Sequence, residues 1–323
     1  MHKRKLIRLL GYVFMSSFLL FAGCQTGNPG GPDTSTPVVT NTPVPTKGQE
    51  AAKTPTATLT PTNTPSPTEE PLKEAREQDF KYIVENGEVT IFGLLDESVQ
   101  NLSIPETIDG YPVTEIEDRA FYGTGIKKVH IPKTITLIGW GAFSGCTNLK
   151  SIVVDEENKW YFSVDEKGEE CNAIISQEGW LIQGCATTKI PEGDYRTLLE
   201  KKYNIEMEDS FFVYRISREA FLETEIESVV IPYNIEEIEF SAFERCRKLE
   251  SVTFEEGVRI IQNQAFMNCT NLTKVVLSGT IEVIGDHVWS GCNKLKEMTI
   301  PKKAVDSYAD LWAKRNGYSV VYK

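Results

Sequence analysis

The chain has few of the residues and none of the motifs from which many enzymes build an active site. Histidine occurs only three times in 323 residues. The sequence contains no His-Glu-x-x-His zinc motif, no Gly-x-Ser-x-Gly elbow and no glycine-rich phosphate loop. Acidic residues are abundant but scattered, without spacing that predicts a catalytic pair. We therefore predict that the protein is not an enzyme and needs no cofactor and no metal.

Basic residues and cysteines are also scarce. The 34 Lys and Arg residues are outnumbered by 46 Asp and Glu residues, which gives a net charge of −12. Nucleic-acid binding needs a basic surface, so we predict no nucleic-acid partner. Seven cysteines in 323 residues are far below the density of a small disulfide-stabilised scaffold.

A long apolar run is missing as well. The longest, Leu9–Ala22, has 14 residues and is too short to span a bilayer comfortably. It follows a cluster of basic residues and ends in small residues, a pattern typical of an export signal. The segment from Leu20 to Cys24 resembles the lipobox of bacterial lipoproteins, although Phe21 stands where that family usually has leucine.

The lipobox resemblance implies cleavage after residue 23, lipid attachment at Cys24 and an anchor on the extracellular face of a bacterial membrane. The alternative is ordinary secretion with an incidental cysteine. Residues 24–72 then form a stalk, because ten of the 16 prolines and no aromatic residue lie between Gln25 and Pro71. We expect this Thr/Pro-rich segment to be disordered and to provide reach, or to be a linker of no particular length.

The rest of the chain repeats every 22 or 23 residues, with one interruption. An Ala-Phe dipeptide, Val-Trp in the last copy, lies at residues 120–121, 142–143, 220–221, 242–243, 265–266 and 288–289. A segment of the type Leu-x-x-Leu-x-Leu follows each dipeptide, starting at Ile126, Leu149, Ile226, Leu249, Leu272 and Leu295. The second half of this segment alternates as a strand does, so stacked copies predict a solenoid with a parallel sheet. Pro132, Pro232 and Pro301 should end their strands.

These repeats, with the consensus Ile-x-x-Ile-x-x-x-Ala-Phe-x-x-Cys-x-x-Leu-x-x-Ile-x-Ile-Pro, resemble the BspA-like leucine-rich repeats of bacterial surface proteins. The resemblance implies a β-rich, right-handed leucine-rich repeat solenoid of short parallel strands, preceded by the stalk. The expected parts are an N-terminal cap at 73–112, repeats at 113–301 with an insert at about 192–212, and a C-terminal cap at 302–323. Cys171 to Cys185 resembles a variant coil of the family.

Two features of this array invite a chemical interpretation. Four cysteines occupy one repeat position, at Cys146, Cys246, Cys269 and Cys292. They form either a metal or disulfide ladder or, as the periodicity favours, a column of small buried side chains. Pairing of Cys171 with Cys185 stays open. The insert is either a partner-binding segment or a tolerated surface excursion.

Alternation also predicts a binding face from the outward strand positions. These form two stripes: Lys128, His130, Ser151, Val153, Ser228, Val230, Ser251, Thr253, Lys274, Val276, Glu297 and Thr299. Their small and β-branched side chains predict a flat surface suited to protein contact, or are simply good strand residues. The family resemblance suggests adhesion to a protein of a host or neighbouring cell surface.

Two other functions stay open. One is recognition of an envelope or dietary glycan, for which Trp160 and Tyr161 are the clustered aromatic candidates. The other is a structural spacer of the cell envelope without a specific ligand.

Overall fold

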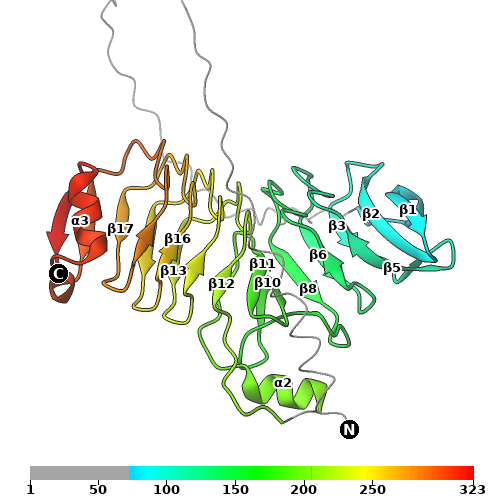
Figure 1. The fold of residues 1–323 in the computed structure, drawn as a ribbon. Helices are drawn as coiled ribbons and strands as arrows, with labels where there is room; N and C mark the ends of the chain where they lie inside the picture. Colours follow the sequence, from blue (N-terminus) through cyan, green and yellow to red (C-terminus); the bar gives the residue numbers. More distant parts are fainter. Residues whose placement is uncertain (1–72, 205) are drawn as a thin grey trace, which may run out of the picture. The chain divides into compact units, whose positions relative to one another are not determined.

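The computed structural model describes residues 73–204 and 206–323. The signal segment and stalk predicted for residues 1–72 lie outside these described residues. Successive coils stack along an array that runs from cyan to red in Figure 1. A regular coil contributes a two-residue strand, a turn with the Ala-Phe dipeptide and a longer strand. The predicted solenoid of short parallel strands is therefore confirmed.

The longer strands form parallel ladders, whose outward surface we call the strand face. The first ladder contains β3 (Asn101–Ser103), β6 (Lys128–Ile131) and β8 (Ser151–Val154). The second contains β13 (Ser228–Ile231), β15 (Ser251–Phe254), β17 (Lys274–Val276), β19 (Glu297–Ile300) and β20 (Ser319–Tyr322). Strands β6, β13 and β19 end directly before a proline, as predicted, because proline has no amide proton for the next ladder bond.

Short strands build a separate ladder on another side of each coil. It contains β12 (Arg215–Ile216), β14 (Glu237–Ile238), β16 (Ile260–Ile261) and β18 (Val283–Ile284). Strands β9 (Tyr161–Val164), β10 (Glu170–Ser176) and β11 (Trp180–Gln183) extend this ladder antiparallel to one another, with β11 parallel to β12. The variant coil therefore joins the array through its short-strand side.

Separate elements cover the two ends of the array. The N-terminal end has η1 (Glu77–Asp79), β1 (Phe80–Glu85), β2 (Glu88–Leu94), β4 (Thr107–Ile108) and β5 (Tyr111–Ile116), and β5 pairs with β7 (Leu137–Ile138). The C-terminal end has η2 (Lys302–Ala304), α3 (Tyr308–Arg315) and β20. The Ser307 hydroxyl caps α3 by accepting a hydrogen bond from the Asp310 amide.

A column of aromatic rings fills the core at the Ala-Phe turns. Phe243 is fully buried and stacks between Phe221 and Phe266, with ring centroids 4.6 and 5.0 Å apart. Trp289 continues the column 6.3 Å from Phe266. Such offset ring pairs contribute beyond the area they bury. The aromatic residues that the sequence aligned in successive repeats therefore stack on one another in the core.

Each Ala-Phe turn uses two residues with positive φ. One stands directly before the alanine, as Gln264 does at φ 62°, and one stands two residues after the aromatic, as Arg245 does at φ 57°. Glycine takes these positions in some coils, for example Gly145 at φ 72°. A side chain in the left-handed region costs roughly 1–2 kcal/mol, so the stacked turns impose this conformation on residues that do not favour it.

The four repeat cysteines form the predicted column of small buried side chains. Their S–H groups donate to the carbonyl oxygen of the aromatic residue one coil earlier, with distances of 3.0–3.1 Å for Cys146, Cys246, Cys269 and Cys292. Burial raises the pKa of the Cys146 thiol. Cys171 and Cys185 are also buried and carry free thiols. The column therefore links successive coils through hydrogen bonds.

The insert contains α2 (Arg196–Tyr203), which Figure 1 draws beyond the ends of the strands. It is anchored in the core, because Tyr195 is fully buried and its hydroxyl donates to the Val164 carbonyl at 2.9 Å. Leu199 of α2 is buried as well. The insert is thus more than a surface excursion. None of the helices in residues 73–204 and 206–323 combines the length and apolar character needed to cross a membrane.

Candidate functional site

The predicted outward residues divide by exposure. Exposed are Lys128, Ser228, Val230, Lys274 and Glu297, and half-buried are His130, Ser151, Val153, Ser251, Thr253 and Val276. Thr299 contradicts the prediction, because it is only 7% exposed. It lies between Val276 of β17 and Val321 of β20 in the ladder, so β-branched neighbours flank it on both sides. We therefore remove Thr299 from the candidate face.

The two stripes are also not continuous. Within the second ladder the register aligns Ser228, Ser251 and Lys274 in one row and Val230, Thr253 and Val276 in the next. In the first ladder Lys128 aligns with Ser151, and His130 with Val153. Strands β8 and β13 are not paired, so each stripe is interrupted between them. The two stripes predicted on one sheet face are therefore divided between two sheets.

The interruption does not extend to the Ala-Phe turns. At the Ala-Phe turns the coils before and after the variant coil touch, because the Ser144 hydroxyl donates to the Glu219 carbonyl at 2.9 Å. The Gly145 amide also donates to the Leu222 carbonyl at 3.0 Å. A bidentate ion pair between Arg119 and Glu219 adds a link over 100 positions of the sequence. The variant coil therefore separates the neighbouring coils at the strand face and leaves them in contact at the turns.

Side chains of the variant coil region cover the edge of β8. The Val154 amide donates to the Ser163 hydroxyl at 2.9 Å, and the Ile152 amide donates to the Asn172 side-chain oxygen at 3.4 Å. The Thr187 hydroxyl donates to the Lys150 carbonyl at 2.6 Å. Side chains therefore take the place of a partner strand at these three groups.

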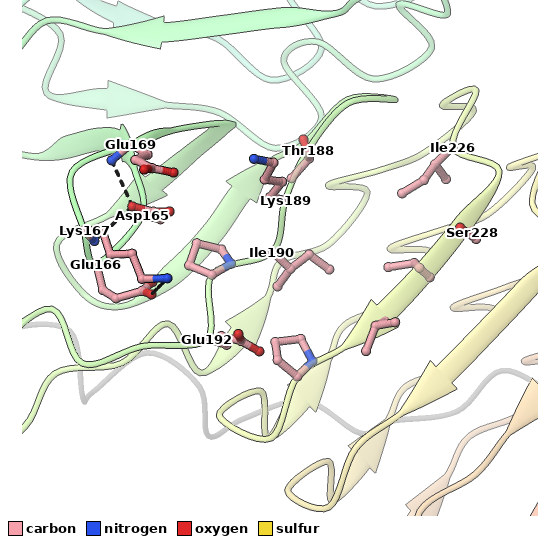
Figure 2. Close-up of a pocket in the computed structure, with 14 residues that line it drawn as sticks. Asp165, Glu166, Lys167, Glu169, Thr188, Lys189, Ile190, Glu192, Ile226 and Ser228 are labelled. Carbon is pink, nitrogen blue, oxygen red and sulfur yellow. Dashed lines mark hydrogen bonds and ion pairs between the residues drawn. The ribbon is translucent and has the colours of Figure 1, made fainter.

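A groove lies along the facing edge of β13. Figure 2 shows one part of it, a hollow of about 420 Å³ lined by β13, residues 188–192 and the turn at residues 165–169. A second hollow of about 510 Å³ continues toward Lys150 and Lys248. Ile226 and Ser228 line both hollows, so they form one groove along the strand. We call it the β13 groove.

The two aromatic residues predicted for glycan binding, Trp160 and Tyr161, do not form an exposed platform. Tyr161 is buried, and its hydroxyl accepts a hydrogen bond from the Ile138 amide at 3.0 Å. Trp160 is half-buried and packs against the core. The structure instead exposes Trp140 to 59%, with the Arg218 guanidinium 5.3 Å from its ring centroid. The sequence did not predict the contact between Trp140 and Arg218, because 78 positions separate the two residues.

The described residues offer little for metal or redox chemistry. Residues 73–204 and 206–323 contain no group of three or more His, Cys, Asp and Glu side chains arranged to hold a metal ion. Nδ1 of His287 lies 3.1 Å from the Ser290 hydroxyl, in an exposed position at a turn. Cys24, predicted to carry a lipid, lies outside the described residues.

The chain matches the model of a known repeat family. A family model described as the BspA type leucine rich repeat region matches residues 95–163 and 214–312 in six copies. The unmatched stretch between them holds β10, β11 and α2. Among curated proteins, none matches the chain.

Several solved structures resemble the chain. A leucine-rich repeat protein of T. pallidum is 20% identical, with a TM-score of 0.38, over 77% of this chain and 98% of its own. A leucine-rich cell surface protein of Faecalibacterium prausnitzii is 22% identical, with a TM-score of 0.40, over 69% of this chain and 63% of its own. The pneumococcal vaccine antigen PcpA is 19% identical, with a TM-score of 0.39, over 71% of this chain and 67% of its own.

Proposed function

Because the chain belongs to the BspA-type leucine-rich repeat family, with six copies over more than half of its length, we propose that it is a cell-surface module that binds a protein. The observation that carries this proposal is the strand face of the second ladder. Its small and β-branched side chains stand in register over β13, β15 and β17. A flat surface of this kind suits protein contact better than capture of a small molecule. The role that follows is adhesion to a host or neighbouring cell.

The test is a matched pair of variants of the immobilised chain. Thr253→Lys places a charge in the middle of the strand face, and Val283→Lys places the same charge on the exposed short strand β18. Extracellular proteins captured by the wild type should be lost with Thr253→Lys and kept with Val283→Lys. Equal capture by all three chains would contradict the proposed face.

The proposed anchor is tested separately. Metabolic labelling with palmitate should mark the wild-type chain and not Cys24→Ala. The buried Cys171 provides a control, and Cys171→Ala should still be labelled. Labelling of Cys24→Ala at the wild-type level would contradict lipid attachment, whereas the family would stand unchanged.

Glycan recognition is the second candidate, supported by the exposed Trp140 beside Arg218. Indole rings offer a flat apolar face, and a guanidinium offers hydrogen-bond donors for hydroxyl groups. Binding on a glycan array that is abolished by Trp140→Ala would favour this function. Absence of both glycan and protein ligands would favour a structural spacer.

A further inference from the structure

Backbone groups of β13 point into the β13 groove and have no hydrogen-bond partner among the described residues. The Glu250 amide donates to the Glu227 carbonyl, and the Glu255 amide donates to the Ile231 carbonyl, so odd-numbered residues of this strand direct their polar groups to β15. Successive residues of a strand direct them to opposite edges. The N–H and C=O groups of Ser228 and Val230 therefore face the groove. Among the hydrogen bonds of residues 73–204 and 206–323, none reaches these groups from the side of β8.

Side-chain exposure gives an independent sign of the open edge. Val230 is 55% exposed, whereas Val276, which has a strand on both sides, is half-buried. Ser228 is exposed, and its neighbour Ser251 is half-buried. The difference has a simple cause, since β13 has a strand on one side only. Sheet edges of this kind accept an additional strand.

The backbone groups at the two edges of the gap, on β8 and on β13, differ in their hydrogen bonding. On the β8 side, the Ile152 and Val154 amides donate to Asn172 and Ser163, and the Lys150 carbonyl just before the strand accepts from Thr187. On β13 no side chain of the described residues bonds to Ser228 or Val230 from the gap side. Among the described residues, the strand amides that face this gap without a partner are therefore those of β13.

The walls of the groove indicate the charge of the occupant. In the hollow that Pro232 helps to line, the acids Asp165, Glu169 and Glu192 have no ion pair among the described residues. Lys189 lies on the same wall. At the other end, Lys248 already pairs with Glu225. The unpaired charge is thus mainly negative, which favours an incoming segment with a lysine or arginine near Pro232.

We propose that the β13 groove binds an extended, basic segment of a partner protein by strand addition to β13. The N–H and C=O groups of Ser228 and Val230 would pair with the segment, and Asp165, Glu169 and Glu192 would face its basic side chain. Pairing ends at Pro232, which has no amide proton. This inference rests on the proposed protein-binding function and specifies one site for it.

The experiment uses the purified chain and a labelled octapeptide of alternating lysine and threonine, measured by fluorescence anisotropy. Val230→Pro removes a groove-facing N–H without removing a bond to β15, because prolines are tolerated on edge strands when that N–H is unpaired. Its binding should fall about tenfold or more. Val230→Thr keeps the N–H and should bind as the wild type does. Equal affinity of Val230→Pro and the wild type would overturn the proposal.

A second measurement does not depend on the folding of a variant. The same octapeptide with every backbone nitrogen methylated cannot donate to β13 and should not bind. If it binds as well as the parent peptide, or if the parent shows no saturable binding up to about 1 mM, strand addition is refuted.

Charge is tested with Glu192→Gln, which should weaken binding of the lysine–threonine peptide about two- to fivefold at low salt. An octapeptide of alternating glutamate and threonine should bind more weakly than the lysine peptide. Equal binding of the two peptides would refute the basic occupant. Thr253→Lys separates this site from the strand face, because it should abolish protein capture and leave peptide binding intact. Capture that persists would contradict the strand face, and loss of peptide binding would contradict a groove distinct from that face.

Discussion

Removal of one ring from the aromatic column measures how much the stacked turns stabilise the solenoid. Phe243 is the ring to change, because it is fully buried and has a stacked neighbour on both sides. In Phe243→Ala the cavity is closed off by Phe221 and Phe266, whose positions are set by their own coils. The neighbouring coils therefore have little freedom to collapse into the space.

The expected magnitude follows from the lost contacts. Truncation of a buried phenylalanine costs about 3–5 kcal/mol of unfolding free energy. Two ring pairs are lost as well, each worth about 0.5–1.5 kcal/mol beyond burial. Since both neighbours stay in place, we expect a value in the upper part of the 3–5 kcal/mol range.

Urea unfolding followed by circular dichroism, with hydrogen exchange to locate the change, provides the assay. In a repeat protein each coil contacts its neighbours only, so protection should fall most in β13, β15 and β17. Phe92→Ala is the control, because Phe92 is 44% exposed on β2 and its loss should cost about 1 kcal/mol or less. A Phe243→Ala chain within 1 kcal/mol of the wild type would refute the reasoning.

Three further predictions concern the coil geometry and its pH dependence. Gly184→Ala should lower the unfolding free energy by about 1–3 kcal/mol, because a Cβ there would lie 2.2 Å from the Phe221 ring. Gly125→Ala is the control, because a Cβ at Gly125 meets no atom within 4 Å. Equal unfolding midpoints of the two variants would contradict this packing. Gln264→Gly, at φ 62°, should leave stability unchanged or raise it by about 1 kcal/mol, and a loss in urea unfolding would argue against the left-handed turn. Burial raises the pKa of Tyr161 to about 12 from about 10 in the unfolded chain. This stabilisation is complete below pH 10 and is lost as the pH rises toward 12, so Tyr161→Phe should flatten the decline of unfolding free energy in this range, and identical slopes would contradict it.

The repeat pattern was a good guide to what lies inside each coil. Alternation in the Leu-x-x-Leu-x-Leu segments identified the inward residues of the strands. The spacing of the Ala-Phe dipeptides and of the cysteines identified Phe243 and Cys269, which are fully buried. Prolines after β6, β13 and β19 identified the strand ends. These features depend on residues within one coil and on its neighbour one period away, so they appear directly as spacing in the sequence.

Other structural features could not be predicted from repeat spacing. The left-handed positions are held by residues such as Gln264 and Arg245, whose types do not favour positive φ. Tyr195 lies in an insert with no repeat spacing, yet it is a core residue. Thr299 follows the outward pattern but is buried, because its exposure depends on which strands flank it.

The sequence by itself determined the period of the solenoid, the inward face of each coil and the columns of phenylalanine and cysteine, because hydrophobic alternation and repeat spacing act locally and recur. Only the tertiary structure decided which strands are neighbours. The variant coil keeps the turns of the flanking coils in contact and parts their strands, so β8 is covered by side chains and β13 is left open. Strand pairing joins residues that are distant in the chain, and the open edge is a consequence of that packing.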